Sequence, residues 1–552
     1  MWVEEIDEFF KGYLPYYVLI VLPLFIIISP INPIHASHEF PVYRMQHFDL
    51  HGVPYGSRSA SVNLEARSLL NWKALRHCVV SKMKDLTIDQ FRDIRTKAGA
   101  LLTIVPNDLA NLSKEEKQHF LSLESAMISQ DVPIPIYFIK DSPEFEEIYT
   151  EITENSAVND LKKSATEALF SSVAANGYQI VISPGTPNLK KDIKITTIQG
   201  QLVANNLKDE KISTIAIIAH YDSFGIAPEL SFGADSNGSG VAVLFELIRI
   251  FSDLYEDPKT HGKANIIFLL TGGGKINFMG SKKWLEDQLD SLDGSIVQDS
   301  AFVMCLDTLG NSDSLYMHVS KPPKEGTAPH SFYKELKNAG EHKLNGSVEG
   351  VHKKINLADD ILAWEHERYS IRRLPAFTLS TVKNYRDNSR NTILDVKDSL
   401  NVDRLVKNTR IIAEALASQI HNISNKSIIG KAFDVDRHHI ESWLELIAKQ
   451  PRSTQLLSSK DNYLLKAFKD YFDKNLQDTK VYYSSPDKRD PEYQFYDITQ
   501  SVVNIYSVKP AVFDLFLTIA IVIYLAVIYL CVQKFSMLYV VACSLTSKNK
   551  CN

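Results

Sequence analysis

The sequence predicts an α/β fold: a mostly parallel sheet with flanking helices. Two observations lead to this prediction. Between Ala100 and Leu379, short runs that are apolar at consecutive positions alternate with segments whose apolar residues recur at helical spacing. Consecutive apolar residues are typical of strands that are covered on both faces, and alternation with helices is typical of strands joined by crossover helices.

The apolar runs are the predicted strands: Ala100–Val105, Pro135–Ile139, Tyr178–Ser183, Thr214–Ala219, Asn265–Leu270, Ala301–Leu306, Leu315–Val319 and Pro375–Leu379. The clearest helix is predicted over Val241–Leu254, directly after Gly238-Ser239-Gly240. Its apolar residues are spaced for one helix face and are Val241, Leu244, Phe245, Ile248 and Phe251.

After Lys426 the pattern changes to helices rich in charged and aromatic residues, without apolar strand runs. We therefore expect a C-terminal helical region after the α/β domain, and a smaller lobe before it. The predicted segments are a signal peptide or signal anchor at 1–37, an N-terminal lobe at 38–160, the α/β domain at 161–425, a helical membrane-proximal region at 426–509, a transmembrane helix at 510–533 and a cytosolic tail at 534–552.

The transmembrane helix is predicted from Val512–Val532, in which Asp514 is the only charged residue. About 20 apolar residues, at about 1.5 Å of rise each, span the hydrocarbon core of a bilayer. Lys534, Lys548 and Lys550 follow this segment. Because positive charge favours the cytosolic side, we expect a cytosolic tail and a large lumenal domain on a single-pass protein.

The N-terminal apolar stretch, Tyr13–Ile31, is predicted to be a signal peptide. It is followed by the small residues Ala36 and Ser37, after which cleavage can occur. Its leading region is acidic where a signal peptide normally carries basic residues, so an uncleaved signal anchor is the alternative. Either form directs the rest of the chain into the secretory pathway.

Glycosylation sequons agree with that compartment; they begin at Asn111, Asn237, Asn345, Asn422 and Asn425. The five cysteines do not form a disulfide framework, and Cys305, within an apolar run, is expected to be a buried thiol. The formal charge of −6 argues against direct nucleic-acid binding, which needs a surplus of Lys and Arg.

Candidate metal-ligating residues follow the predicted strands, at whose carboxyl ends open α/β sheets bind ligands. Thr214–Ala219 is followed by His220-Tyr221-Asp222, in which the imidazole is a possible metal ligand and the carboxylate can hold its orientation. The alternative is a pair of ordinary polar loop residues. Gly233–Gly240 precedes the predicted helix, and its simplest interpretation is a turn with helix-capping residues.

Together these two motifs resemble those of the di-zinc aminopeptidases. The resemblance implies that His220 and Asp307 stand at two of the five ligand positions of that family. It also implies that the other positions have changed: Ser236, Lys275 and Arg386 replace ligands, and Gly274 replaces the general base.

These replacements predict a site that neither binds metal nor catalyses. Glycine takes no proton from water, a lysine ammonium repels a metal ion, and a zinc site needs at least three protein ligands. We therefore expect no catalytic residue, no bound metal and no cofactor, with Lys275 or Arg386 paired to Asp222 or Asp307. The alternatives are an active metallo-aminopeptidase and a phosphate-binding loop at 272–275, which lacks the full Walker spacing.

A second resemblance extends over nearly the whole chain and is carried by ordered strings of residues: His38–Met45, Ala219–Gly225, Gly233–Gly240, Val319–Gly326, Ile355–Ala358, Ala363–Arg368, Arg372–Ser380, Asp487–Pro491 and Val508–Asp514. These strings resemble the nicastrin/nicalin family, which combines a degenerate zinc-aminopeptidase-like domain with an N-terminal signal and one C-terminal span.

That resemblance implies a non-catalytic scaffold subunit in the endoplasmic reticulum membrane. It implies assembly with nodal modulator and a small multi-pass membrane protein, in the ribosome-associated translocon that inserts multi-pass membrane proteins. Antagonism of Nodal signalling is also implied. The alternative within the family is a nicastrin-like receptor, in which the old cleft still binds a substrate or partner.

Overall fold

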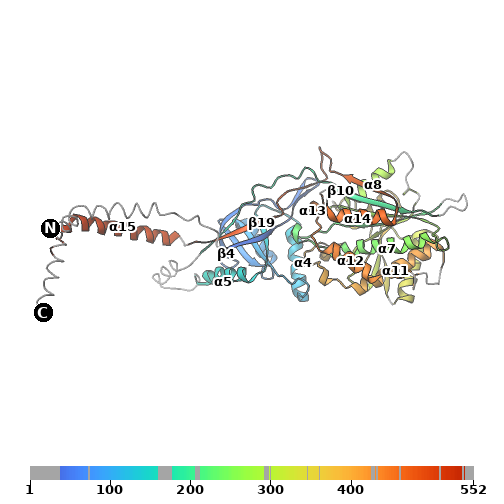
Figure 1. Ribbon diagram of the computed structural model, residues 1–552, viewed down its shortest axis with the longest axis horizontal. Helices are drawn as coiled ribbons and strands as arrows, with labels where there is room; N and C mark the ends of the chain where they lie inside the picture. Colours follow the sequence, from blue (N-terminus) through green and yellow to red (C-terminus); the bar gives the residue numbers. More distant parts are fainter. Residues whose placement is uncertain are drawn as a thin grey trace, which may run out of the picture.

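The computed structural model describes residues 38–540, except 73–74, 159–176, 205–211, 291–296, 299, 345, 360, 424–428, 431–432, 459–461, 509–510 and 538–539. The signal segment predicted at 1–37 therefore lies outside the described residues. Figure 1 shows a barrel in the middle of the molecule, a larger α/β unit on one side of it and the helix α15 (Ala511–Gln533) projecting from the other.

The α/β unit is built on an eight-stranded sheet. At its centre β11 pairs in parallel with β12 and β13, and β13 pairs in parallel with β16. β14 also pairs in parallel with β15, and antiparallel pairs join β10 to β12, β17 to β10 and β14 to β16, so the sheet is mixed, with a majority of parallel pairs. The strand order is β15 (Ser347–His352), β14 (Ser314–Val319), β16 (Ala376–Ser380), β13 (Ser300–Leu306), β11 (Thr214–His220), β12 (Asn265–Thr271), β10 (Ile195–Leu202) and β17 (Gln477–Ser484).

Helices cover both faces of this sheet, because its central strands are apolar at consecutive positions. Ile215, Ile217 and Ala219 of β11 belong to the core on one face, and Ala216 and Ile218 to the core on the other. In Figure 1, α7, α11 and α12 lie below the sheet and α8 lies above it. The helices of this unit are α7 (Gly238–Glu256), α8 (Met279–Leu289), α9 (Ala328–Lys337), α10 (His366–Ile371), α11 (Val402–His421), α12 (Arg437–Ala448), α13 (Thr454–Leu457) and α14 (Tyr463–Asn475).

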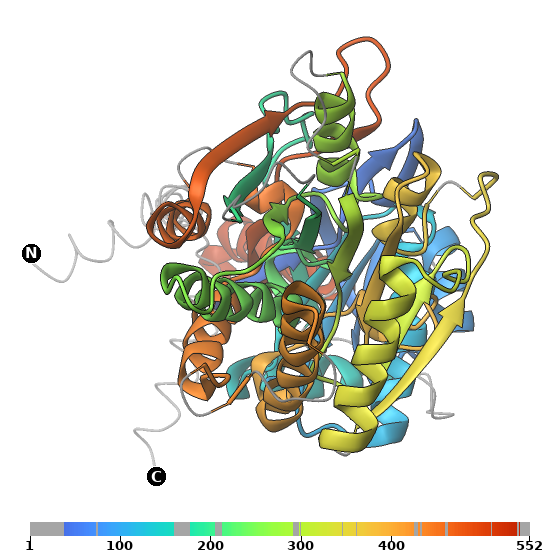
Figure 2. The same ribbon diagram turned by 90° about the vertical axis from the view of Figure 1, so that its right-hand side faces the viewer.

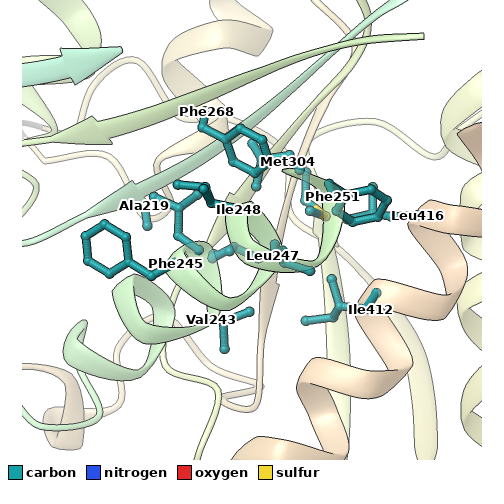
Figure 3. Close-up of a cluster of buried hydrophobic side chains, with 14 of the residues drawn as sticks. Ala219, Val243, Phe245, Leu247, Ile248, Phe251, Phe268, Met304, Ile412 and Leu416 are labelled. Carbon is teal, nitrogen blue, oxygen red and sulfur yellow. The ribbon is translucent and has the colours of Figure 1, made fainter. Parts of the chain in front are cut away.

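Helix α7 is the centre of the larger core. The sequence predicts it over 241–254, and the structure extends it to Gly238–Glu256. Figure 3 shows Phe245, Ile248 and Phe251 of α7 among side chains from the sheet and from α11. All three are fully buried, and each contributes roughly 1.5–3 kcal/mol of hydrophobic stabilisation relative to an exposed side chain.

The smaller unit is a closed barrel. Alternate residues of its strand β6 face two cores: Leu101 and Val105 pack with α3 and α4, and Leu102 and Ile104 pack with α5. The barrel order is β1 (His38–Arg44), β19 (Gln500–Val508), β9 (Gly177–Ile182), β4 (Val62–Ser68), β5 (His77–Lys82), β6 (Ala100–Val105) and β8 (Ile136–Lys140). Its helices are α3 (Ile88–Lys97), α4 (Lys114–Ile128) and α5 (Pro143–Val158).

Short elements complete the described fold. A four-stranded sheet has the order β18 (Tyr493–Phe495), β2 (His47–Leu50), β3 (Val53–Ser57) and β7 (Asp131–Val132). Four short helical turns are η1 (Pro228–Leu230), η2 (Asn338–Lys343), η3 (Asn388–Arg390) and η4 (Lys397–Ser399). Figure 2 views the molecule from the α/β-unit end.

The predicted segment boundaries need two corrections. The lobe expected at 38–160 also takes strands β9 and β19, and it closes into a barrel only through them. The region 426–509, expected to be helical, holds α12–α14 but also β17, β18 and β19. The prediction missed β19 because Val503 and Ile505 are its only buried residues, which leaves no apolar run to recognise.

No helix in the part of the chain that the structure describes is both long and apolar enough to cross a membrane. The span predicted at 510–533 therefore stays a prediction.

The barrel and the α/β unit are joined by a buried carboxylate, that of Glu124 on α4. It accepts hydrogen bonds from Ile226 N (2.7 Å), Ile393 N (3.1 Å) and Thr392 Oγ1 (2.5 Å), all in loops of the α/β unit. Burial raises the pKa of Glu124 to about 7, although these hydrogen bonds act in the opposite direction. One titratable group therefore lies in the contact between the two units.

This pKa predicts a pH-dependent stability. The folded-state pKa is about 7 and the unfolded value 4.5, so the contribution of Glu124 is present below about pH 4.5 and is lost as the pH rises to about 7. In Glu124→Gln that slope, on the order of 3 kcal/mol in total, should disappear. Melting curves of the full chain in detergent, recorded across this pH range, test it. The control Glu115→Gln, at an exposed position of the same helix, should keep the wild-type slope. A wild-type slope in Glu124→Gln would contradict the assignment.

Candidate functional site

The candidate site lies at the carboxyl edge of the central strands. His220 is paired with Thr271, and Ala219 with Leu306, so β11, β12 and β13 end side by side. The loops that follow them, and the segment after β16, therefore meet in one cluster of buried side chains, which we call the edge cavity. The side chains that the sequence predicted here and that the structure brings together are His220, Asp222, Ser236, Lys275 and Asp307.

Asp307 forms a buried ion pair with Arg390. Nη2 of Arg390 donates to Asp307 Oδ2, and its Nη1 donates to the carbonyl oxygens of Ala363 and Tyr385, at 3.2 Å each. The guanidinium also lies 4.2 Å from the centre of the Trp364 ring. Burial alone would raise the pKa of Asp307, but Arg390, His220 and Lys275 together outweigh it and hold that pKa below its usual value. Hydrogen bonds, charge and ring contact thus fix one planar cation against the carboxylate.

Lys275 places a second cation in the edge cavity. Its Nζ donates to Ser236 Oγ and to the carbonyl oxygen of Arg390, both at 2.7 Å. Burial lowers the pKa of Lys275 to about 8, against the opposite effect of Asp307, so the ammonium stays mostly protonated at neutral pH. Two of the three residues that stand at changed ligand positions, Ser236 and Lys275, are therefore hydrogen-bonded to each other.

Asp222 holds the loop after β12 in place. Its two carboxylate oxygens accept hydrogen bonds from Gly274 N (2.7 Å), Lys275 N (3.0 Å) and Thr454 Oγ1 (2.8 Å). Asp222 is one of the two carboxylates predicted to pair with Lys275 or Arg386, and its partners in the structure are backbone amides and a hydroxyl. Both oxygens are occupied by structural hydrogen bonds.

His220 is enclosed by its neighbours. Its Nδ1 lies 3.2 Å from Glu365 Oε2, and Oε1 of the same carboxylate accepts hydrogen bonds from Thr271 Oγ1 (2.8 Å) and Ser281 Oγ (2.5 Å). The backbone of Gly274 lies against the ring, and a Cβ built there would come within 2.3–2.4 Å of three of the side-chain carbons of His220. A glutamate at the general-base position would therefore collide with the histidine.

Two further carboxylates lie beside the edge cavity. Asp395 accepts hydrogen bonds from Asp235 N (2.8 Å) and Ser236 N (2.7 Å), and Asp235 Oδ1 accepts one from Gly310 N (2.8 Å). Burial and the neighbouring Asp395 raise the pKa of Asp235 to about 7. Because Asp235 is held in this way, it does not replace Ser236 as a bridging carboxylate.

A third buried cation, Arg452, holds the loops that carry these residues. Its guanidinium donates to the backbone carbonyl oxygens of Tyr221, Phe232 and Gly233. Burial lowers the pKa of Arg452 to about 10, partly offset by Asp395. The segment after α12, which carries no sequence signal for a place in this site, therefore fixes the loops on one side of the edge cavity.

The arginine of the site is not the expected one. Arg386 is exposed, and its guanidinium lies 5.3 Å from the Tyr385 ring, outside the edge cavity. Arg390, in the same loop, reaches Asp307 instead. The sequence shows both arginines but carries no signal that chooses between them. Sequence reasoning also assigned no role here to Glu365, although it lies within a string used for the family resemblance.

The predicted glycosylation sites differ in their outcomes. Asn237 is fully buried: its Nδ2 donates to His220 O (3.0 Å) and Leu306 O (2.8 Å), and its Oδ1 accepts from Thr308 N (3.1 Å). A glycan does not fit there, so that prediction is wrong. Of the other predicted glycosylation sites, Asn111 and Asn422 are exposed, and Asn345 and Asn425 lie outside the described residues.

The buried thiol predicted at Cys305 is confirmed, because Cys305 is buried and free.

Comparisons with known proteins first define the class of this fold. Residues 202–416 match the sequence family Peptidase family M28. The crystal structure of nicastrin, a γ-secretase component, aligns with 86% of this chain and 100% of its own chain, at a TM-score of 0.60 and 11% identity. The chain therefore has an M28 aminopeptidase-like fold with mixed α/β sheets.

Relatives with higher identity define the family more closely. The human protein named BOS complex subunit NCLN is 42% identical over 537 residues, which cover 95% of each chain. The Caenorhabditis elegans protein named nicalin is 27% identical over 561 residues, covering 95% of this chain and 96% of its own. The chain belongs to the nicalin family, which confirms the resemblance found in the sequence.

The M28 fold implies zinc, and the residues of the edge cavity do not fit it. Among the described residues, no three or more His, Cys, Asp or Glu side chains are placed to share a metal ion. A zinc site needs at least three such ligands. Here Asp307 is paired with Arg390, and the ammonium of Lys275 lies where a dication would be repelled.

The ion pair predicts a specific pattern of stability. Arg390→Met leaves Asp307 buried without its counter-charge, so we expect a loss of about 3–5 kcal/mol. In Asp307→Asn with Arg390→Met the buried charge is gone, and the loss should be smaller than the sum of the two single losses. Apparent melting temperatures of the full chain in detergent measure the cycle.

Arg386→Met is the matched control, because it removes an exposed arginine from the same loop. It should change stability by about 0.5 kcal/mol or less. Equal effects of Arg386→Met and Arg390→Met, or additive effects in the cycle, would contradict the assigned pair.

Proposed function

We propose that this chain is a non-catalytic scaffold subunit of the BOS complex, for which its human relative is named. The observation that carries the proposal is the edge cavity: Arg390 is bonded to Asp307, Lys275 lies beside them, and Gly274 leaves no room for a general base. The match to BOS complex subunit NCLN supports it further, because it extends over 95% of both chains.

The proposed subunit is a single-pass protein of the endoplasmic reticulum membrane. Residues 510–533 form the anchor, the barrel and the α/β unit lie in the lumen, and 534–552 form the cytosolic tail. Large apolar side chains on α15 support the anchor, since Leu515 is 60% exposed and Val522 59% exposed, and such a surface needs lipid or a partner to cover it. Asn111 and Asn422 are exposed and suit lumenal glycosylation.

The proposed partners are nodal modulator and a small multi-pass membrane protein, in the ribosome-associated translocon that inserts multi-pass membrane proteins. The family resemblance supports these partners. A cavity closed by its own side chains, and two units joined through the buried Glu124, suit a rigid binding role better than a catalytic one.

Affinity purification of the tagged full chain from detergent-solubilised membranes tests this function. We expect comparable amounts of the two proposed partners in the purified complex, and no peptidase activity on a broad aminopeptidase panel. Replacing 511–533 by an unrelated apolar helix should reduce recovery of the multi-pass partner, whereas His220→Ala should leave recovery unchanged.

Two outcomes would contradict the proposal. One is a chain that purifies without membrane partners. The other is peptidase activity that His220→Ala abolishes, because this would show that the edge cavity is a working active site.

A further inference from the structure

A large pocket lies far from the edge cavity, at the opposite edge of the sheet. It has a volume of about 920 Å³ and is lined by the first residues of β13 and β16, including Ala301 and Ala376. The loop after β14 closes it, because β14 runs antiparallel to β16 and places Val319 opposite Phe377. The volume is at the upper end of the range for ligand pockets. We call it the amino-edge pocket.

The charged residues that line the amino-edge pocket all carry positive charge. Its charged lining residues are Lys321, Lys324, Lys354 and Arg373, all exposed and all cationic. None of the four has a carboxylate partner among the described residues. Glu325, in the same loop, is exposed and is not a lining residue. Some exposed cations of the α/β unit have an acidic partner, as Lys383 has in Glu349 (3.0 Å), whereas four cations and no carboxylate line this pocket, so it has an unbalanced positive field.

Two uncharged features add to the preference for an anionic group. Helix α9 begins at the pocket with Ala328, its N-cap Thr327 makes no capping hydrogen bond, and its first turn holds no acidic residue. Its N-terminus therefore contributes a partial positive charge. Ser320, which also lines the pocket, has a buried hydroxyl without a hydrogen-bond partner in the described part of the chain.

The walls of the pocket are apolar and rigid. Pro322, Pro323 and Pro375 line it together with Ile355 and Leu374. Proline fixes its backbone angle, so such walls lose little entropy when they are covered. A free inorganic anion would leave these walls uncovered, whereas a chain that carries both carboxylates and apolar side chains would contact the walls and the cations together.

The position of the pocket excludes a bilayer as the occupant. The loop after β11, at the other edge of the sheet, contacts the barrel, with a hydrogen bond from Gln46 N to Ile226 O (2.8 Å). The amino-edge pocket therefore faces away from the barrel, and α15 projects from the far side of that barrel (Figure 1). An anionic lipid surface around α15 is at the opposite end of the molecule.

We propose that the amino-edge pocket binds an extended acidic segment of a partner protein, with carboxylates on the lysines and Arg373 and apolar side chains on the proline walls. This inference deepens the proposed scaffold function and rests on it. It assigns a partner-binding site to a part of the α/β unit that lies away from both the edge cavity and the predicted anchor.

Selection of peptides from a random displayed library on the full chain in detergent tests the proposal. We expect enrichment of peptides rich in Asp and Glu with interspersed apolar residues, and binding that weakens as salt is raised from about 0.05 to about 0.5 M. Lys321→Glu with Arg373→Glu should weaken binding of the selected peptides by about tenfold or more. The milder pair Lys321→Gln with Arg373→Gln should give an intermediate loss.

The matched control is Lys488→Glu with Arg489→Glu, which makes the same charge change at exposed positions outside the pocket and should leave binding unchanged. The proposal is overturned if no acidic peptides are enriched, or if the pocket variant binds them as well as the control. It is also overturned if the pocket cations are needed only for binding inorganic phosphate or phosphatidylserine vesicles.

Recovery of the partner complex shows whether the pocket assignment or the proposed function has failed. If the wild-type chain assembles with its partners but the pocket binds no acidic peptide, only the pocket assignment fails. If acidic peptides bind in the pocket but no complex is recovered, the proposed function fails. Melting temperatures of both variants show whether they are folded.

Discussion

The structure of the edge cavity depends on the neutralisation of buried carboxylates. Asp307 is 1% exposed and Asp222 and Asp395 are also buried, and a buried ionised carboxylate costs several kcal/mol unless charges and hydrogen bonds compensate it. In a di-zinc enzyme the metal ions compensate it. Here Arg390 and Lys275 supply the positive charge from within the chain. The buried carboxylates can therefore be kept without metal ions. The loops that these carboxylates hold then keep their shape as well.

The same requirement explains why the surrounding loops are so firmly held. Asp222 binds the backbone of the loop after β12, Asp395 binds the backbone of the loop before α7, and Arg452 binds the carbonyl groups of that second loop from the other side. Once Gly274 rests against His220, the position of a general base is closed as well. In the proposed scaffold, this charge-balanced cluster of buried side chains takes the place of the reaction space of an enzyme.

Much of the central sheet could be predicted, because its strands are buried on both faces. The run predicted at 214–219 became β11 (Thr214–His220) and the run at 265–270 became β12 (Asn265–Thr271). The edge strands β15 and β17 were missed because neither contains a run of buried residues. At the site, positions adjacent to strand ends, such as His220 and Asp307, were placed correctly in the fold. Arg390 was not, because choosing it over Arg386 depends on the packing of Trp364 and on backbone carbonyl groups far away in the sequence.

The most direct test of this account is the zinc content of the purified full chain after equilibration with trace zinc, measured by elemental analysis. The account predicts less than about 0.1 zinc per chain, because two ligand-type residues remain and cations occupy the space beside them. It predicts the same low value for His220→Ala. One or two zinc ions per wild-type chain, lost on substitution of His220 or Asp307, would contradict it and would show that the edge cavity still binds metal.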